Sequence, residues 1–151
     1  IVDLPARLAQ VALDAACLSE GALDPMLSAA APWLVKLDPD SAAAQMALRE
    51  GWNGHWGIVL VTDAGLDLRS VRAHLRRVLR VRAPDGSSML FRFYDPRAFR
   101  TVIPVLDAPA RMEFFGPIHG AYVESRSPDS VLFFARDGRA EPQALPLSTA
   151  A

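Results

Sequence analysis

The 151-residue sequence contains one cysteine, one lysine and no apolar run approaching 18 residues. The single cysteine, Cys17, cannot form an intramolecular disulfide, which favours a reducing compartment. The lack of a long apolar run argues against a membrane-spanning helix. The first residues show no basic segment followed by an apolar one, so we expect no secretory signal. Because Ala and Arg are also abundant, we expect a bacterial cytoplasmic protein.

The motifs of several enzymes and metal sites are missing as well. There is no Gly-x-Ser-x-Gly and no Gly-x-x-x-x-Gly-Lys, which removes the main support for a serine hydrolase or a nucleotide-phosphate site. The histidines are scattered, without His-x-x-x-His or Cys-x-x-Cys spacing, so we expect no metal and no cofactor. Cys17 could pair with His55, His74 or His119 as a thiol nucleophile, although a lone cysteine is more often a small core residue.

The charge is distributed unevenly along the chain. Residues 1–65 hold three basic and eight acidic residues, a net charge of -5, whereas residues 66–100 hold nine Arg and three Asp, a net charge of +6. Such asymmetry points to a partner surface more than to solubility alone. The overall pI of about 6.3 argues against a dedicated nucleic-acid binder, because the acidic remainder would repel phosphate.

Much of this positive charge lies on one predicted helix, residues 67–79. Leu68, Val71 and Leu75 recur at spacings of three and four and predict its buried side. At the same spacings the arginine stripe, defined here as Arg69, Arg72, Arg76 and Arg80, forms another side. The stripe is either a solvated face, a protein-docking surface or a nucleic-acid site. Arg pairs well with carboxylates, stacks on aromatic rings and is enriched at protein interfaces.

The segment after this helix predicts a hairpin that leads into another helix. Asp85-Gly86 predicts a tight turn between a strand starting at Val81 and a strand at residues 89–94. Asp95 followed by Pro96 predicts an N-cap and the first residue of a helix over 96–103. The second strand would then deliver Tyr94, Asp95 and Arg97 to one edge of a sheet.

The loop at residues 51–57 combines Gly, Trp and His. One hypothesis is a small hydrolase-like enzyme that uses His55 with Asp63 or Asp95, because histidine titrates near neutral pH. A simpler interpretation is that Trp52 and Trp56 close the open end of the core. The loop leads into residues 58–61, a continuous β-branched and apolar run that is typical of a central strand covered on both faces.

The remaining pattern predicts an α/β or α+β fold. We expect a single domain with a mixed β-sheet of about five strands and helices packed on it. Residues 1–124 would form the main domain, and residues 125–151 a C-terminal strand followed, from residue 137, by a loose tail. Further elements are expected as helical segments at 7–16, 24–31, 42–50 and 108–115 and as strands at 33–37, 121–123 and 131–134.

Five sequence blocks, in this order, resemble the family called domain of unknown function 4123. They lie at residues 31–37 (APWLVKL), 51–60 (GWNGHWGIVL), 74–81 (HLRRVLRV), 90–97 (LFRFYDPR) and 114–117 (FFGP). The resemblance covers about residues 1–124. It implies an effector adaptor, or chaperone, of bacterial type VI secretion. Such an adaptor binds a toxic effector near the N-terminal region of the effector and helps to load it on the VgrG spike or its PAAR tip. It also implies that the protein is not an enzyme.

We therefore expect an effector adaptor that binds protein, with no nucleic-acid partner, no membrane partner and no catalytic residue. An Arg-rich helix beside aromatic side chains suits such docking, because both residue types anchor interfaces. An enzyme built on His55 and a nucleic-acid binder built on the Arg-rich helix remain as alternatives. The predicted contact residues are Arg69, Arg72, Arg76, Arg80, Tyr94, Asp95 and Arg97, with Trp52 and Trp56 as second choices.

Overall fold

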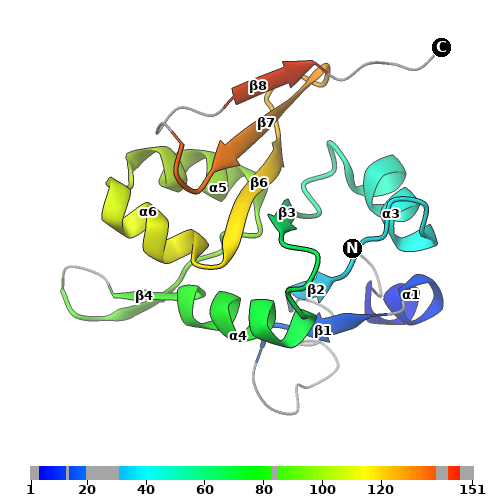
Figure 1. Cartoon of the computed structure of the whole chain (residues 1–151), viewed down its shortest axis with the longest axis horizontal. Coiled ribbons are helices and arrows are strands. Elements are labelled where there is room, and N and C mark those ends of the chain that lie inside the picture. The colour runs from blue at the N-terminus through cyan, green and yellow to red at the C-terminus, as the bar shows by residue number, and fades with distance from the viewer. Residues whose placement is uncertain (1–3, 13, 20–30, 83–84, 139–142, 147–151) are drawn as a thin grey trace.

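The computed structural model describes residues 4–12, 14–19, 31–82, 85–138 and 143–146 (Figure 1). It is a single α/β domain, so the expected fold class is confirmed. The helices are α1 (Leu4–Val11), α3 (Ala42–Met46) with the π-helical turn η1 (Ala47–Gly51), α4 (Leu68–Val78), α5 (Pro96–Val102) with the 3₁₀ turn η2 (Ile103–Val105), and α6 (Ala108–Phe115). The strands are β1 (Ala15–Cys17), β2 (Trp33–Val35), β3 (Val59–Thr62), β4 (Arg80–Arg82), β5 (Ser88–Leu90), β6 (Ile118–Glu124), β7 (Ser130–Ala135) and β8 (Gln143–Pro146).

The largest sheet has four strands in the order β3-β6-β7-β8, and all three of its pairings are antiparallel. Two separate antiparallel pairs, β1-β2 and β4-β5, complete the strands of the described ranges. The strands are thus divided among three sheets, where we had expected one mixed sheet of about five. The helical segment expected at 24–31 falls outside the described residues, apart from its last one.

A cluster of phenylalanines fills the space between the sheet and the helices that cover it. In Figure 1, α5 and α6 lie against one face of β6 and β7, and α4 passes below them. Phe99 is fully buried, with its ring centroid 5.8 Å from Phe114, 6.3 Å from Phe115 and 5.2 Å from Phe134. These edge-to-face pairs each contribute about 0.5–1.5 kcal/mol beyond the burial of their area. The core therefore ties α5 and α6 firmly to the sheet.

Most helices begin where the sequence predicted, because a local side chain caps each one. The carboxylates of Asp67, Asp95 and Asp107 accept hydrogen bonds from backbone N–H groups in the first turns of α4, α5 and α6. The Ser41 hydroxyl does the same for α3. Such caps satisfy N–H groups that have no partner inside the helix and contribute about 1 kcal/mol each.

The strand predicted at residues 89–94 was wrong beyond Leu90. The hairpin itself is present, with Arg80 opposite Leu90 and Val81 opposite Met89. Its partner strand begins at Arg80, directly after α4. The residue that follows β5, Phe91, can therefore form a backbone hydrogen bond only with the end of the helix. The N–H of Phe91 accordingly donates to the carbonyl of Leu79 at 2.8 Å, and the chain then turns, with the N–H of Asp95 donating to the carbonyl of Arg92 at 3.0 Å.

Two further predictions about strands need correction. The apolar run at 58–61 does form β3, but within the described ranges β3 is the first strand in the sheet order and pairs only with β6, so it is an edge strand there and not a central one. The expected loose tail contains a strand: β8 pairs with β7 through Val131 and Leu132, opposite Leu145 and Ala144. Neither outcome is encoded locally, because strand neighbours are set by long-range contacts.

Candidate functional site

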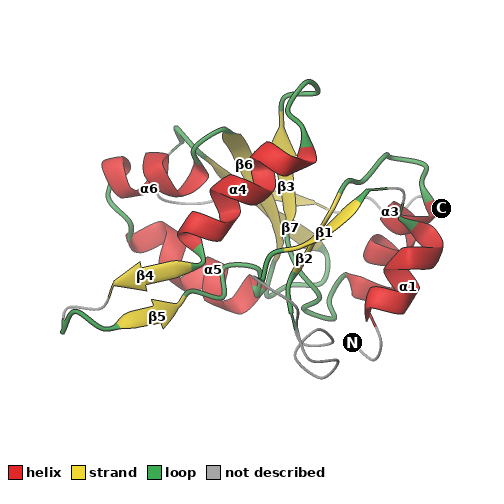
Figure 2. Ribbon diagram, turned by 90° about the horizontal axis from the view of Figure 1, so that it is seen from below, coloured by secondary structure: helices red, strands yellow, loops and turns green. Residues whose placement is uncertain are grey.

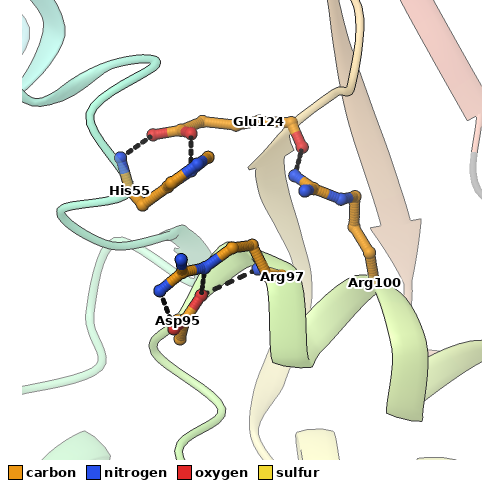
Figure 3. A network of polar contacts seen from close by, with 5 residues as sticks. All are labelled: His55, Asp95, Arg97, Arg100 and Glu124. Carbon is orange, nitrogen blue, oxygen red and sulfur yellow. Dashed lines mark hydrogen bonds and ion pairs between the residues drawn. The ribbon is translucent and has the colours of Figure 1, made fainter.

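A buried carboxylate at the end of β6 contacts the loop at residues 51–57. Glu124 is 1% exposed, and its carboxylate oxygens accept a hydrogen bond from the backbone N–H of His55 at 3.1 Å and lie 2.7 Å from His55 Nδ1 (Figure 3). His55 has a φ of 57° and Asn53 a φ of 61°, so the loop adopts a left-handed conformation that is uncommon outside glycine. Glu124 therefore holds a strained loop through one backbone and one side-chain contact.

This geometry gives His55 a different carboxylate from the two that the sequence suggested. Asp63 Oδ1 lies 2.9 Å from Nε2 of His119, and Asp95 is bonded to Arg97. Among the described residues, the carboxylate that contacts His55 is thus that of Glu124, and Asp63 and Asp95 contact other side chains. A carboxylate on Nδ1 fixes the orientation of an imidazole, as it does at catalytic histidines. In the described ranges, no group of three or more His, Cys, Asp and Glu side chains could hold a metal ion.

Beside this contact, Asp95 and Arg97 form a second fixed pair at the start of α5 (Figure 3). Asp95 Oδ1 accepts from the Arg97 backbone N–H at 2.9 Å and from its Nε at 2.9 Å, and Oδ2 accepts from its Nη2 at 2.7 Å. The hydrogen bonds and charge of Arg97 lower the pKa of Asp95 to about 2. One turn later, Arg100 donates to the backbone carbonyl of Glu124. Asp95 is thus the helix cap that the sequence predicted, and it also sets the direction of Arg97.

Replacing Asp95 by alanine should destabilise the protein by about 1–2 kcal/mol, because both the cap and the bidentate pair are lost. In the wild type this contribution should be complete above about pH 4, because the pKa of Asp95 is lowered on folding from 3.8 to about 2. It should disappear as the pH falls through that interval. Urea unfolding at pH 7 and pH 2.5 measures both effects. Equal destabilisation by the substitution at the two pH values would contradict the assigned role.

The structure divides the arginine stripe into exposed and half-buried members. Arg69 and Arg80 are exposed, whereas Arg72 and Arg76 are half-buried. Arg72 Nε donates to the backbone carbonyl of Cys17 at 2.7 Å, so this side chain ties α4 to β1. Arg72 therefore places the middle of the stripe against β1. Arg69 and Arg80 are the members best placed to contact a partner.

Arg80 begins the β4-β5 hairpin, which projects from the body of the domain (Figure 2). All six of its strand residues are exposed. One face carries Arg80 opposite Leu90 and Arg82 opposite Ser88, and the other carries Val81 opposite Met89. Met89 is 53% exposed and Leu90 57%. A two-stranded hairpin is marginally stable alone, and clustered exposed apolar side chains often mark binding surfaces.

The other predicted contact residues are mainly packed against neighbours. Tyr94 is half-buried, with its ring 5.8 Å from that of Phe93 and the Arg92 guanidinium 5.8 Å from its centroid. Trp52 and Trp56 are also half-buried, and Arg7 lies over the Trp56 ring at 5.2 Å. The predicted residues thus fall in three places: the α4 stripe and hairpin, the start of α5, and the 51–57 loop.

Sequence reasoning missed Glu124 altogether, although it joins two of these places. It is separated from His55 by 69 residues, so no local spacing connects them. It also missed Arg82 and Leu90 as exposed members of the hairpin. The alternation of Arg80, Val81 and Arg82 was an available signal for the first of them, since residues two apart share a strand face.

The fold and these surfaces define a small α/β domain whose charged and apolar side chains converge on α4 and the hairpin that follows it. Within the described residues, none of the helices is both long and apolar enough to cross a bilayer. The chain belongs to the family Domain of unknown function (DUF4123), whose model matches residues 1–113. The matched range includes the arginine stripe, the hairpin and α5, and it ends before Glu124. Comparison with curated proteins and with solved structures finds no match.

Proposed function

We propose that this domain is a cytoplasmic adaptor that binds an effector protein of bacterial type VI secretion and assists its loading on the VgrG or PAAR spike. Membership of the DUF4123 family supports the proposal, given the role that the sequence resemblance implies. On this proposal the domain acts by binding and release.

The observation that carries the proposal is the combined surface of α4 and the hairpin. Exposed Arg69, Arg80 and Arg82 lie with exposed Leu90 on consecutive elements of the chain. Arg beside apolar side chains is the composition found at the centres of protein interfaces. The positive charge favours a segment with acidic residues, and it raises the rate of encounter with such a partner.

Replacing Arg69 and Arg80 by glutamate should weaken capture of the effector encoded beside this protein by about tenfold to a hundredfold, since interfacial arginines often dominate binding. Both side chains are exposed, so the fold should be retained. Co-purification of the tagged domain with that effector, followed by a titration of the purified pair at several salt concentrations, measures the loss. Binding by the wild type should weaken as salt increases.

The matched control for each single substitution, Arg69→Glu or Arg80→Glu, is Arg126→Glu, which makes the same change of charge at an exposed residue in the turn between β6 and β7. In Figure 1 that turn lies at the opposite end of the domain from α4. Equal loss in the control would mean that net charge, and not this surface, is responsible. Absence of any captured effector with the wild type would remove the function itself. Retention of nucleic acid by the purified wild type, lost in the Arg69 and Arg80 variant, would favour the nucleic-acid alternative.

A further inference from the structure

A groove of about 390 Å³ runs between β2 and β3. The two strands lie next to each other in both views (Figure 1, Figure 2). On the β3 side the lining includes Gly57, Ile58, Val59, Leu60 and Thr62, and on the β2 side it includes the consecutive residues 33–37. A groove on the face of a sheet is lined by every second residue of a strand. A groove along the edge of a sheet is lined by consecutive residues of the strand. The groove therefore runs along the edges of both strands.

Both of these edges lack a strand partner in the described part of the chain. β2 pairs with β1 only, and β3 pairs with β6 only. An edge strand exposes a row of unpaired N–H and C=O groups, and proteins usually protect it with charge, proline or a bulge. Residues 58–62 contain no charge and no proline, and the single register shift lies at the end of β3, between Val61 and Thr62. Most of this edge is therefore unprotected.

The sequence of β3 has the composition of a strand with neighbours on both sides. Residues 58–61 are Ile-Val-Leu-Val, which is typical of the interior of a sheet, yet each residue of β3 is only half-buried. The groove walls also hold Trp33 and Trp52, whose indole N–H groups are buried and have no acceptor among the described residues. Buried donors of this kind are normally paired, and an added backbone would bring carbonyl acceptors to the groove.

We infer that the groove binds an extended, mainly apolar segment of the effector, which pairs with β3 as an additional strand. This inference rests on the proposed function and specifies the chemistry of the bound segment. Strand addition supplies affinity through main-chain hydrogen bonds, while the walls select side chains. The apolar lining from Leu4, Leu8, Leu66 and Val71 suits valine, isoleucine or leucine in that segment. The basic surface of α4 and the hairpin then contacts a different part of the same effector.

Hydrogen exchange of the purified complex with the neighbouring effector tests the inference directly. The β3 amides that do not bond to β6 should exchange at least about tenfold more slowly in the complex than in the free domain. A second measurement uses Gly57→Trp. Gly57 lines the groove, has no positive φ, and a Cβ there would meet no atom within 4 Å, so the backbone accepts a side chain at this position, and thermal unfolding of the variant checks that the fold is retained. This variant should capture the effector about tenfold less well.

The control for the added side chain is Ala108→Trp, at an exposed residue that begins α6 outside the groove, which should leave capture unchanged. If the wild type captures the effector but the β3 amides are unaffected and Gly57→Trp binds normally, the groove inference is wrong and the proposed function stands. If the wild type captures no effector, the proposed function fails and this inference with it. Protection of β3 in the free domain, with a dimeric mass, would identify a second copy as the occupant and overturn the inference.

Discussion

Replacement of Glu124 by alanine should destabilise the protein by about 2–4 kcal/mol, because a buried side chain and its hydrogen bonds are lost together. The carboxylate contacts the backbone N–H and Nδ1 of His55, and 1% of the residue is exposed. For a domain of this size the Tm should fall by roughly 10 °C. Thermal unfolding followed by circular dichroism measures this change.

Two variants separate the possible causes of that loss. Glu124→Gln keeps the shape and one acceptor, so it should cost less than the alanine variant, about 1–2 kcal/mol. Glu113→Ala removes an exposed glutamate from α6 and should change stability by no more than about 0.5 kcal/mol. Hydrogen exchange at the amide of His55 should accelerate in both Glu124 variants. Unchanged exchange at that amide would show that Glu124 does not hold the loop.

Features that depend on residues close together in the sequence could be predicted, whereas the role of Glu124 could not. The cap at Asp95 was readable because the capping side chain and the N–H group that it binds lie two residues apart. The hairpin was readable for the same reason, since Asp85-Gly86 specifies its own turn. The cap at Asp95 was therefore the part of the candidate site that the sequence could establish.

The errors occurred where a neighbour in space, and not in sequence, decides the outcome. The composition of residues 58–61 indicated a central strand, but in the part of the chain that the structure describes β3 pairs only with β6, which lies about 60 residues later in the chain. The strand predicted at 89–94 ended early because α4 occupies the residues that would have continued its partner. Likewise His55 drew attention by its chemistry, while the carboxylate that fixes it comes from a distant strand. The contact between His55 and Glu124 depends on the fold, so it could not be found from residues that are close together in the sequence.

The largest effect of a single added methyl group is expected at Gly116, which ends α6. Its φ of 52° and ψ of -114° lie in a region that is accessible essentially to glycine alone. A Cβ at this position would lie 2.4 Å from Cε1 of His74 and 2.8 Å from its Nδ1. The imidazole cannot move away freely, because it is buried and its Nε2 is 2.7 Å from the backbone carbonyl of Phe114. Gly116→Ala therefore combines backbone strain with a collision inside the core.

We expect Gly116→Ala to destabilise the protein by about 3–5 kcal/mol, the sum of a strained backbone and an overpacked contact. Gly86→Ala isolates the first cause, since Gly86 has a φ of 84° and open space around a Cβ; it should cost only about 1 kcal/mol. Gly65→Ala lacks both causes and should be neutral within about 0.5 kcal/mol. Urea unfolding of the three variants measures these differences. If Gly116→Ala costs no more stability than Gly86→Ala, the His74 ring does not pack on Gly116 as described. If it costs much more, the contact with His74 fixes the point where α6 ends and β6 begins.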